Sequence, residues 1–298
     1  MQPPLLELNV KKIICTFLLL VASTSALSQT TMPYSLENTE VLSVSSKELK
    51  RDYEIFVSLP ESYKTSTKRY PVVFVTDANY AFPLTRALAA RVGAHGKHLE
   101  EFILVGLSYA KGDTPEFSRR RDYTPGPSLE TKYKSDILGR EPLFGEAEGY
   151  RRFIANSVFP LIAQHYRADM DRKVFSGHSY GSLLGLHILL TEPSMFSYYI
   201  LGSPSLWYGK RIMFEREKQY ATTHTDLNAN IFFAVGGLET GEGEDNMVGN
   251  LKQFEALIKS RRYPGLHVQS KVLADEDHLS VAPMIMTRGL KWALPGQR

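Results

Sequence analysis

The chain has 298 residues, of which 43% are apolar or aromatic and 22% are charged, and its formal net charge is +3. This composition suits a folded chain with a sizeable core, and it excludes a disordered, collagen-like or coiled-coil protein. The weak positive charge argues against a nucleic-acid partner, and a single cysteine, Cys15, excludes a disulfide framework, a cysteine-rich zinc site and an iron–sulfur cluster.

The first residues have the pattern of a secretory signal peptide. Lys11 and Lys12 precede a short apolar run, residues 13–22, and small residues follow. A run of about ten residues would extend about 15 Å as a helix, which is too short for a bilayer. We expect a signal peptide over residues 1–28, cleaved after Ala26 or Ser28. The mature chain would be periplasmic or secreted and would not bind a membrane, and a retained N-terminal anchor is the alternative.

Beyond the leader, apolar runs of strand length alternate with helical patterns. The predicted strands are 54–60, 70–76, 102–107, 173–176, 198–201, 231–235 and 267–273. The predicted helices are 153–162, with a kink or break at Pro160, and 183–190, 247–258 and 284–292. The polar segment 109–149 is expected to be a long excursion. Buried strands alternating with helices predict an α/β fold, a mainly parallel sheet with helices on both faces, in a single domain over residues 29–298.

Gly177-His178-Ser179-Tyr180-Gly181 is a G-x-S-x-G sequence between a predicted strand and an apolar helix. This setting is typical of a nucleophile elbow, in which a sharp turn exposes a serine hydroxyl at the start of a helix. The glycines remove side chains that would collide with the neighbouring strand and helix. The sequence therefore predicts Ser179 as a nucleophile. The alternative is a glycine-rich turn with a bystander serine.

A nucleophilic serine needs a base, and in this fold the chain order is serine, acid, histidine. His224 precedes the strand that would lead to the acid, and His267 falls within a predicted strand. His278 follows the last strand, at the sheet edge where catalytic groups gather, and is therefore the predicted base. Glu239, four residues past the strand 231–235, is the predicted acid. Its rivals are Glu242, Glu244, Asp245 and Asp277.

The oxyanion hole should use two backbone N–H groups. One is that of Tyr180, directly after the nucleophile. The other belongs to the loop after strand 70–76, where Ala78 or Asn79 would donate.

Several blocks of the sequence together resemble the putative-esterase family, the esterase D-like branch of the α/β-hydrolases. They are 70–77, 121–125, 177–181, Ser203-Pro-Ser-Leu-Trp207 and Asp277-His278. The block 203–207 looks most like siderophore-esterase-like bacterial hydrolases. The resemblance implies an α/β-hydrolase fold and a serine carboxylic-ester hydrolase. It also implies nucleophile Ser179, base His278 and the acid at Glu239. We expect no cofactor and no metal.

The substrate would be a small-molecule ester, such as that of a siderophore. Arg119, Arg120 and Arg121 would form a cationic wall for an anionic substrate, or Arg121 would anchor the loop through a carboxylate. Trp207 and Tyr208 would line the pocket or pack beneath it. Two alternatives stay open for the function: an acyltransferase with a hydroxyl acceptor, and a non-catalytic ligand-binding scaffold. The sequence does not predict an oligomeric state.

Overall fold

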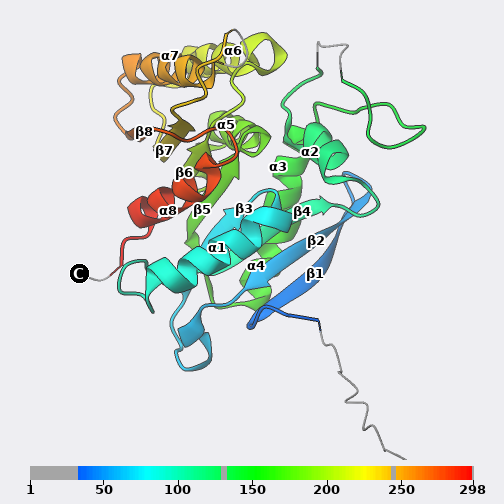
Figure 1. The fold of residues 1–298 in the computed structure, drawn as a ribbon, viewed down its shortest axis with the longest axis vertical. Coiled ribbons are helices and arrows are strands. Elements are labelled where there is room, and N and C mark those ends of the chain that lie inside the picture. The colour runs from blue at the N-terminus through cyan, green and yellow to red at the C-terminus, as the bar shows by residue number, and fades with distance from the viewer. Residues whose placement is uncertain (1–32, 129–132, 243–245, 297–298) are drawn as a thin grey trace, which may run out of the picture. The chain divides into compact units, whose positions relative to one another are not determined.

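A computed structural model describes residues 33–128, 133–242 and 246–296 of the chain (Figure 1). The chain divides into two units, Met1–Leu36 and Glu37–Arg298. Residues 33–36 of the first unit have no regular secondary structure. The expected signal peptide lies outside the described residues, so its cleavage stays a prediction. All the elements below belong to the second unit.

A mixed eight-stranded sheet runs through the described part of this unit, in the order β1-β2-β4-β3-β5-β6-β7-β8 (Figure 1). The pairs β1/β2 and β2/β4 are antiparallel and all other neighbours are parallel. Every residue of β3 is buried, as expected for a parallel strand covered on both faces. The strands are β1 Thr39–Ser46, β2 Arg51–Ser58, β3 Tyr70–Val75, β4 Ile103–Ala110, β5 Ala168–His178, β6 Tyr198–Gly202, β7 Ala229–Gly236 and β8 Leu266–Leu273.

Helices cover both faces of the sheet. The helices are α1 Ala78–Gly93, α2 Pro115–Tyr123, α3 Ala147–Phe153, α4 Phe159–His165, α5 Tyr180–Thr191, α6 Tyr208–Thr223, α7 Met247–Ser260 and α8 Val281–Ala293. The short turns are η1 Glu61–Lys64, η2 Ile154–Val158 and η3 Pro193–Met195. Together with the sheet order, this arrangement confirms the predicted α/β-hydrolase fold.

Two neighbouring side chains of β6 show that α5 and α8 lie on opposite faces. A Cβ added to Gly289 of α8 would come within 2.4 Å of Ile200, and one added to Gly185 of α5 within 2.4 Å of Leu201. Successive strand residues point to opposite sides, so the two helices sandwich β6. Helix α1 packs beside α8, and α2, α3 and α6 pack around α5 (Figure 1).

Some elements were not predicted from the sequence, namely β1, α1, α2 and α6. Helix α1 contains Pro83, which obscures its pattern, and β1 is an edge strand with several exposed residues. The predicted helix 153–162 is interrupted: α3 and α4 are separated by the π-helical turn η2, just before Pro160. Proline has no N–H for the helical ladder, which accounts for a break at this point. The 109–149 segment begins inside β4 and contains α2.

No helix among the described residues is both long and apolar enough to cross a membrane.

Candidate active site

Three of the predicted site residues follow neighbouring parallel strands at their carboxyl ends. Ser179 comes directly after β5, Glu239 follows β7, and His278 follows β8. Because β5, β6, β7 and β8 are consecutive in the sheet, these ends lie along one edge. The topology therefore brings together residues that are far apart in the sequence.

Ser179 sits in a left-handed backbone conformation, with φ 59° and ψ −118°, at the turn from β5 into α5. The flanking glycines are required by close packing. A Cβ on Gly177 would lie 2.4 Å from the backbone of Gly181, and a Cβ on Gly181 would lie 2.2 Å from Thr76 Oγ1. A non-glycine residue with such a φ is strained, and strain of this kind clusters at functional sites. The predicted elbow geometry is present.

His278 and Glu239 are in direct contact, with 2.6 Å between His278 Nδ1 and Glu239 Oε2. An ionised carboxylate only accepts hydrogen bonds, so Nδ1–H must donate to it. In the neutral ring this leaves the lone pair on Nε2, which is the form that a general base requires. Glu239 thus fixes the tautomer of His278.

Glu239 is 7% exposed and accepts three hydrogen bonds. Its Oε1 accepts from Ser203 Oγ at 2.6 Å and from the Gly236 N–H at 2.8 Å, while Oε2 accepts from His278. Burial alone would raise the pKa of this carboxyl, but the hydrogen bonds from His278, Ser203 and Gly236 outweigh it, and the pKa lies below its usual value. Glu239 is therefore held ionised.

The hydroxyl of Ser179 is hydrogen bonded to another hydroxyl. Its Oγ lies 3.3 Å from Ser205 Oγ, and within the described residues no hydrogen bond joins Ser179 to His278. The His278 ring lies beside that of His178, the residue before Ser179, at 4.6 Å between centroids. The predicted base thus lies close to the turn that carries the predicted nucleophile, and catalytic hydrogen bonds are often longer before substrate binds.

His178 presents a half-buried, neutral ring to His278. Its Nε2 has no hydrogen-bond partner within the described chain. Burial, with the nearby His278, lowers the pKa of His178 to about 3. A neutral neighbour does not repel a proton gained by His278, so His178 supports the ring without competing for charge.

The predicted oxyanion donors lie at the starts of two helices. Tyr180 is the first residue of α5 and Ala78 the first of α1, so neither N–H has a helical partner four residues back. Strand β3, which leads to Ala78, pairs with β5, which leads to Tyr180. Asn79 follows on the exposed side, and its Oδ1 accepts from Ser108. Ala78 and Asn79, which the sequence analysis placed in a loop, thus belong to the first turn of α1, and their role as donors stays a prediction.

The rival acids differ from Glu239 in their surroundings. The Asp277 carboxylate accepts from the backbone N–H groups of Leu279 and Ser280, which lowers its pKa and ties it to the start of α8. Glu242 is exposed. Glu244 and Asp245 lie outside the described residues.

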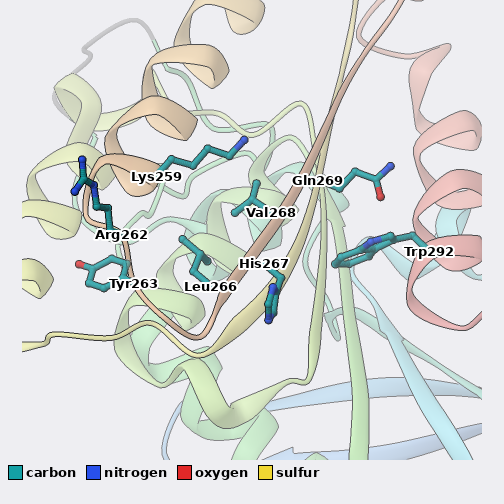
Figure 2. A pocket seen from close by; sticks show the side chains of 8 residues that line it. All are labelled: Lys259, Arg262, Tyr263, Leu266, His267, Val268, Gln269 and Trp292. Carbon is teal, nitrogen blue, oxygen red and sulfur yellow. The ribbon is translucent and has the colours of Figure 1, made fainter.

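His267, which the sequence analysis set aside, is at the amino end of β8 (Figure 2). It lines a hollow of about 530 Å³ together with Trp292 and residues near the end of α7. This end of the strand is opposite to the one that carries His278, so His267 is remote from Ser179.

The two predicted pocket aromatics surround Tyr180. Trp207 is half-buried with its ring centroid 6.0 Å from that of Tyr180, and Tyr208 is 5.8 Å away but 1% exposed. The Tyr208 hydroxyl donates to the carbonyl oxygen of Gly126 at 2.8 Å. Tyr208 packs beneath the site, and Trp207 is the partly exposed one of the two.

The position of Arg121 contradicts the prediction that it belongs to a cationic wall facing the substrate. Its side chain is fully buried, donates to Asp113 at 2.5 Å and binds both oxygens of Asp122 at 2.8 and 2.9 Å. The guanidinium of Arg121 forms hydrogen bonds with these two carboxylates, because a buried charge requires partners. Arg121 is a structural anchor of α2. This agrees with the alternative interpretation, in which Arg121 anchors the loop through a carboxylate.

Arg119 also has a buried carboxylate partner. It binds the buried Asp77 carboxylate at 3.1 Å, and its guanidinium lies 5.2 Å from the Tyr180 ring centroid. Arg119, rather than Arg121, is the arginine beside the elbow. Arg120 pairs with Glu116 at 2.8 Å.

Two residues in contact with the site were given no role from the sequence, Ser203 and Ser205. They belong to the 203–207 block and directly follow β6. Their position after a central parallel strand was the available signal. No cluster of three or more potential metal ligands occurs within the described chain.

Most of the chain matches a known protein family. Residues 46–263 match the model of the family described as "Putative esterase". The chain belongs to this family. It is a carboxylic ester hydrolase with an α/β-hydrolase fold.

The curated relatives of this chain include proteins that are themselves named esterases. The chain is 32% identical over 273 residues to the ferri-bacillibactin esterase BesA of Bacillus subtilis, covering 89% of this chain and 92% of the relative. It is 31% identical over 177 residues to a siderophore triacetylfusarinine C esterase of Aspergillus fumigatus, covering 57% of each.

Solved structures are similar over most of the chain. The BES protein from Bacillus cereus superimposes with a TM-score of 0.73 at 26% identity, covering 89% of this chain and 98% of that one. The siderophore hydrolase EstB from Aspergillus nidulans gives 0.74 at 24% identity, covering 90% and 97%, which shows the shared fold.

Proposed function

We propose that this esterase is a serine hydrolase in which Ser179 is the nucleophile, His278 the base and Glu239 the acid that orients it. The observation that carries the proposal is the 2.6 Å contact between Glu239 and His278 Nδ1, at the sheet edge where the strained Ser179 turn lies. The contact leaves Nε2 free to accept a proton, and the turn exposes the hydroxyl that supplies it.

In the first half of the reaction the Ser179 Oγ attacks the ester carbonyl while its proton passes to His278 Nε2. The tetrahedral intermediate collapses as the bond to the alcohol oxygen breaks, and His278 returns the proton to that oxygen. The acyl group is now an ester of Ser179. In the second half, water attacks this ester, gives its proton to His278, and Ser179 recovers that proton on leaving.

The negative charge on the carbonyl oxygen would be held by the N–H of Tyr180 and by that of Ala78 or Asn79. Their helix N-termini favour an anion, and one such donor is worth about 3 kcal/mol in the transition state. Glu239 stays ionised and stabilises the protonated ring.

The proposed substrate is a small-molecule ester of the siderophore type. Two relatives named for siderophore esters support this class. The half-buried Trp207 beside Tyr180 offers a flat apolar surface for an aromatic or acyl group, with Arg119 behind the Tyr180 ring.

The Ser179→Ala variant tests the mechanism. It should lose p-nitrophenyl ester hydrolysis by a factor of about 10³ or more, because the attacking oxygen is removed, while its unfolding midpoint stays near that of the wild type. Ser197→Ala is the matched control, since Ser197 lies on the surface and donates to the Asp171 carbonyl oxygen. Undiminished turnover by Ser179→Ala would overturn the proposal.

A substrate panel tests the substrate class. We expect kcat/KM to be highest for a trilactone siderophore ester, and lower for feruloyl, acetyl-sugar and simple acyl esters. The free acid should be the product even when a short alcohol is added. A preference for feruloyl or acetyl esters would contradict the substrate class, and an ester of the added alcohol as main product would make the protein an acyltransferase.

We also propose that the protein is exported and loses residues up to Ala26 or Ser28. The support is the sequence pattern of the leader, with Lys11 and Lys12 before an apolar run. The N-terminal sequence of protein recovered from the periplasm or medium should begin at residue 27 or 29. Recovery of the uncleaved chain with the membrane fraction would contradict export and favour a retained anchor.

A further inference from the structure

The segment Ser203-Pro204-Ser205 lies between the strands that carry Ser179 and Glu239, because β6 lies between β5 and β7. Ser203 has a left-handed φ of 38°, and its N–H donates to the carbonyl oxygen of Ala234 on β7 at 2.8 Å. A serine held in this conformation is strained, so the neighbouring strands must fix it.

Each serine of this segment contacts a different end of the proposed triad. Ser203 Oγ donates to Glu239 Oε1 at 2.6 Å. Ser205 Oγ lies 3.3 Å from Ser179 Oγ. Both serine residues are fully buried.

The direction of the hydrogen bond between Ser205 and Ser179 follows from the surroundings of Ser205. Within the described residues, the Ser205 hydroxyl has no partner besides Ser179 Oγ. A buried hydroxyl whose proton finds no acceptor costs about 1–3 kcal/mol, so Ser205 O–H donates to Ser179 Oγ. The proton of Ser179 itself then remains available for His278.

We propose that Ser203 and Ser205 are positioning residues of the esterase, with Ser205 orienting the nucleophilic oxygen and Ser203 orienting the carboxylate that holds His278. This inference rests on the proposed function of Ser179, His278 and Glu239. The backbone reinforces it, since the Ser205 N–H lies 3.5 Å from the carbonyl oxygen of Ser179.

Ser205 acts without giving up its proton. As Ser179 attacks, its own proton moves to His278 Nε2 and the new bond to the carbonyl carbon forms. The Ser205 O–H continues to donate to the same Oγ, which carries growing negative charge until that bond is made. The bond therefore favours one rotamer of Ser179 and lowers the barrier to attack.

Ser203 acts through Glu239. With Ser203 and the Gly236 N–H on Oε1, only Oε2 is left for His278. The titratable groups facing Glu239 are His278 and, from the end of β5, His178. Asp277 also lies beside His278 but is bound to the start of α8. Losing the Ser203 donor would raise the pKa of Glu239, so its carboxylate would be protonated at a higher pH.

The Ser205→Ala variant tests the contact with the nucleophile. We expect kcat and the rate of labelling by a fluorophosphonate each to fall about tenfold, which is the effect of one hydrogen bond, with KM within twofold. The acid limb of the pH profile should not move. Rates are measured at a temperature well below the thermal unfolding midpoint of the variant. A labelling rate within twofold of the wild type would overturn the role of Ser205.

The Ser203→Gly variant tests the contact with the acid. Glycine accepts the left-handed φ without strain, so the hydroxyl is removed while the fold is preserved. We expect the acid limb of kcat/KM to move to higher pH, with kcat lowered several-fold even on the plateau. A purely structural role would lower the unfolding midpoint and leave the limb in place, and an unmoved limb would overturn the role of Ser203.

Ser176→Ala is the matched control for both variants. Ser176 is buried like the two serines and lies three residues before Ser179, but within the described part of the chain its hydroxyl hydrogen bonds to the sulfur of Met286 alone, at 3.6 Å. Its rates and pH profile should match the wild type. Failure of the inference is separable from failure of the proposed function, because only the latter leaves the labelling of Ser179→Ala intact.

Discussion

Glu239 is the residue on which the site's electrostatics depend most. It is buried, yet three donors keep it ionised and direct one oxygen to His278. An isolated buried carboxylate would be protonated, and it could not then fix the ring. The protein thus stabilises a negative charge beside His278, and in the proposed mechanism this charge stabilises the protonated ring.

The Glu239→Gln variant should lower kcat/KM by a factor of about 10²–10⁴. The amide keeps the shape of the side chain but no longer carries the charge that holds the protonated His278, and its NH₂ group opposes Nδ1–H donation. Steady-state kinetics at pH 7 measure this. Glu242→Gln is the matched control, because Glu242 is exposed. Turnover by Glu239→Gln within threefold of the wild type would move the role elsewhere or reduce the triad to a dyad.

Residue by residue, the sequence predicts those parts of the site that follow from chain order. Ser179 and His278 follow from the elbow motif and from the position after the last strand, and Glu239 from its distance past β7. The contacts of Ser203 and Ser205 could not be predicted, since they depend on the loop after β6 meeting two other loops. Arg119 and Arg121 belong to the same run of three arginines, and the sequence does not distinguish them. Only the fold shows which of the two pairs with Asp77.

At the scale of elements, the elbow depends on close packing between the first turn of α5 and the end of β3. Gly181 is the point of closest approach, because a Cβ there would lie 2.2 Å from Thr76 Oγ1. Any side chain must push apart the two helix starts that carry Tyr180 and Ala78.

The Gly181→Ala variant should therefore lose about 1–3 kcal/mol of unfolding free energy and most of its activity. Chemical denaturation and steady-state kinetics measure the two effects. Gly93→Ala is the matched control, since its added Cβ would be 3.7 Å from Leu99, an ordinary contact. Wild-type kcat in a folded Gly181→Ala variant would show that the elbow does not need this approach.

Helix α2 is held by the buried ion pairs of Arg121, and the Arg121→Met variant tests this. It should lower the unfolding free energy by about 3–5 kcal/mol, because Asp122 and Asp113 lose a buried partner. KM should change less than twofold in the folded protein. Arg120→Met should cost less than about 1 kcal/mol, since its pairing with Glu116 is partly exposed. A several-fold rise in KM with unchanged stability would return Arg121 to substrate binding.

Elements were predictable where hydrophobic periodicity was undisturbed. The buried strands β3, β6 and β7 and helix α5 are continuous apolar runs, and their positions agree with the prediction to within a few residues. Helix α1 carries an internal proline, and α6 has a run of polar residues and positive φ angles near its start, so local pattern does not identify either.

For the whole molecule, the order of the strands in the sheet brings motifs that are far apart in the sequence together at one site. The residues after β5, β6, β7 and β8 meet because these strands are parallel neighbours, and helices on both faces hold them in register. Alternation of strands and helices predicts this fold class. It does not give the strand order or the loop contacts, which depend on packing between distant segments.

The central claim is that Ser179 is the nucleophile, and covalent labelling tests it most directly. After reaction with a fluorophosphonate, intact mass should show one phosphonyl group per chain, and peptide mapping should place it on Ser179, whose oxygen is the one activated by His278. Ser179→Ala should remain unlabelled while Ser197→Ala labels at the wild-type rate. An adduct on another residue, or equal labelling of Ser179→Ala, would contradict the claim.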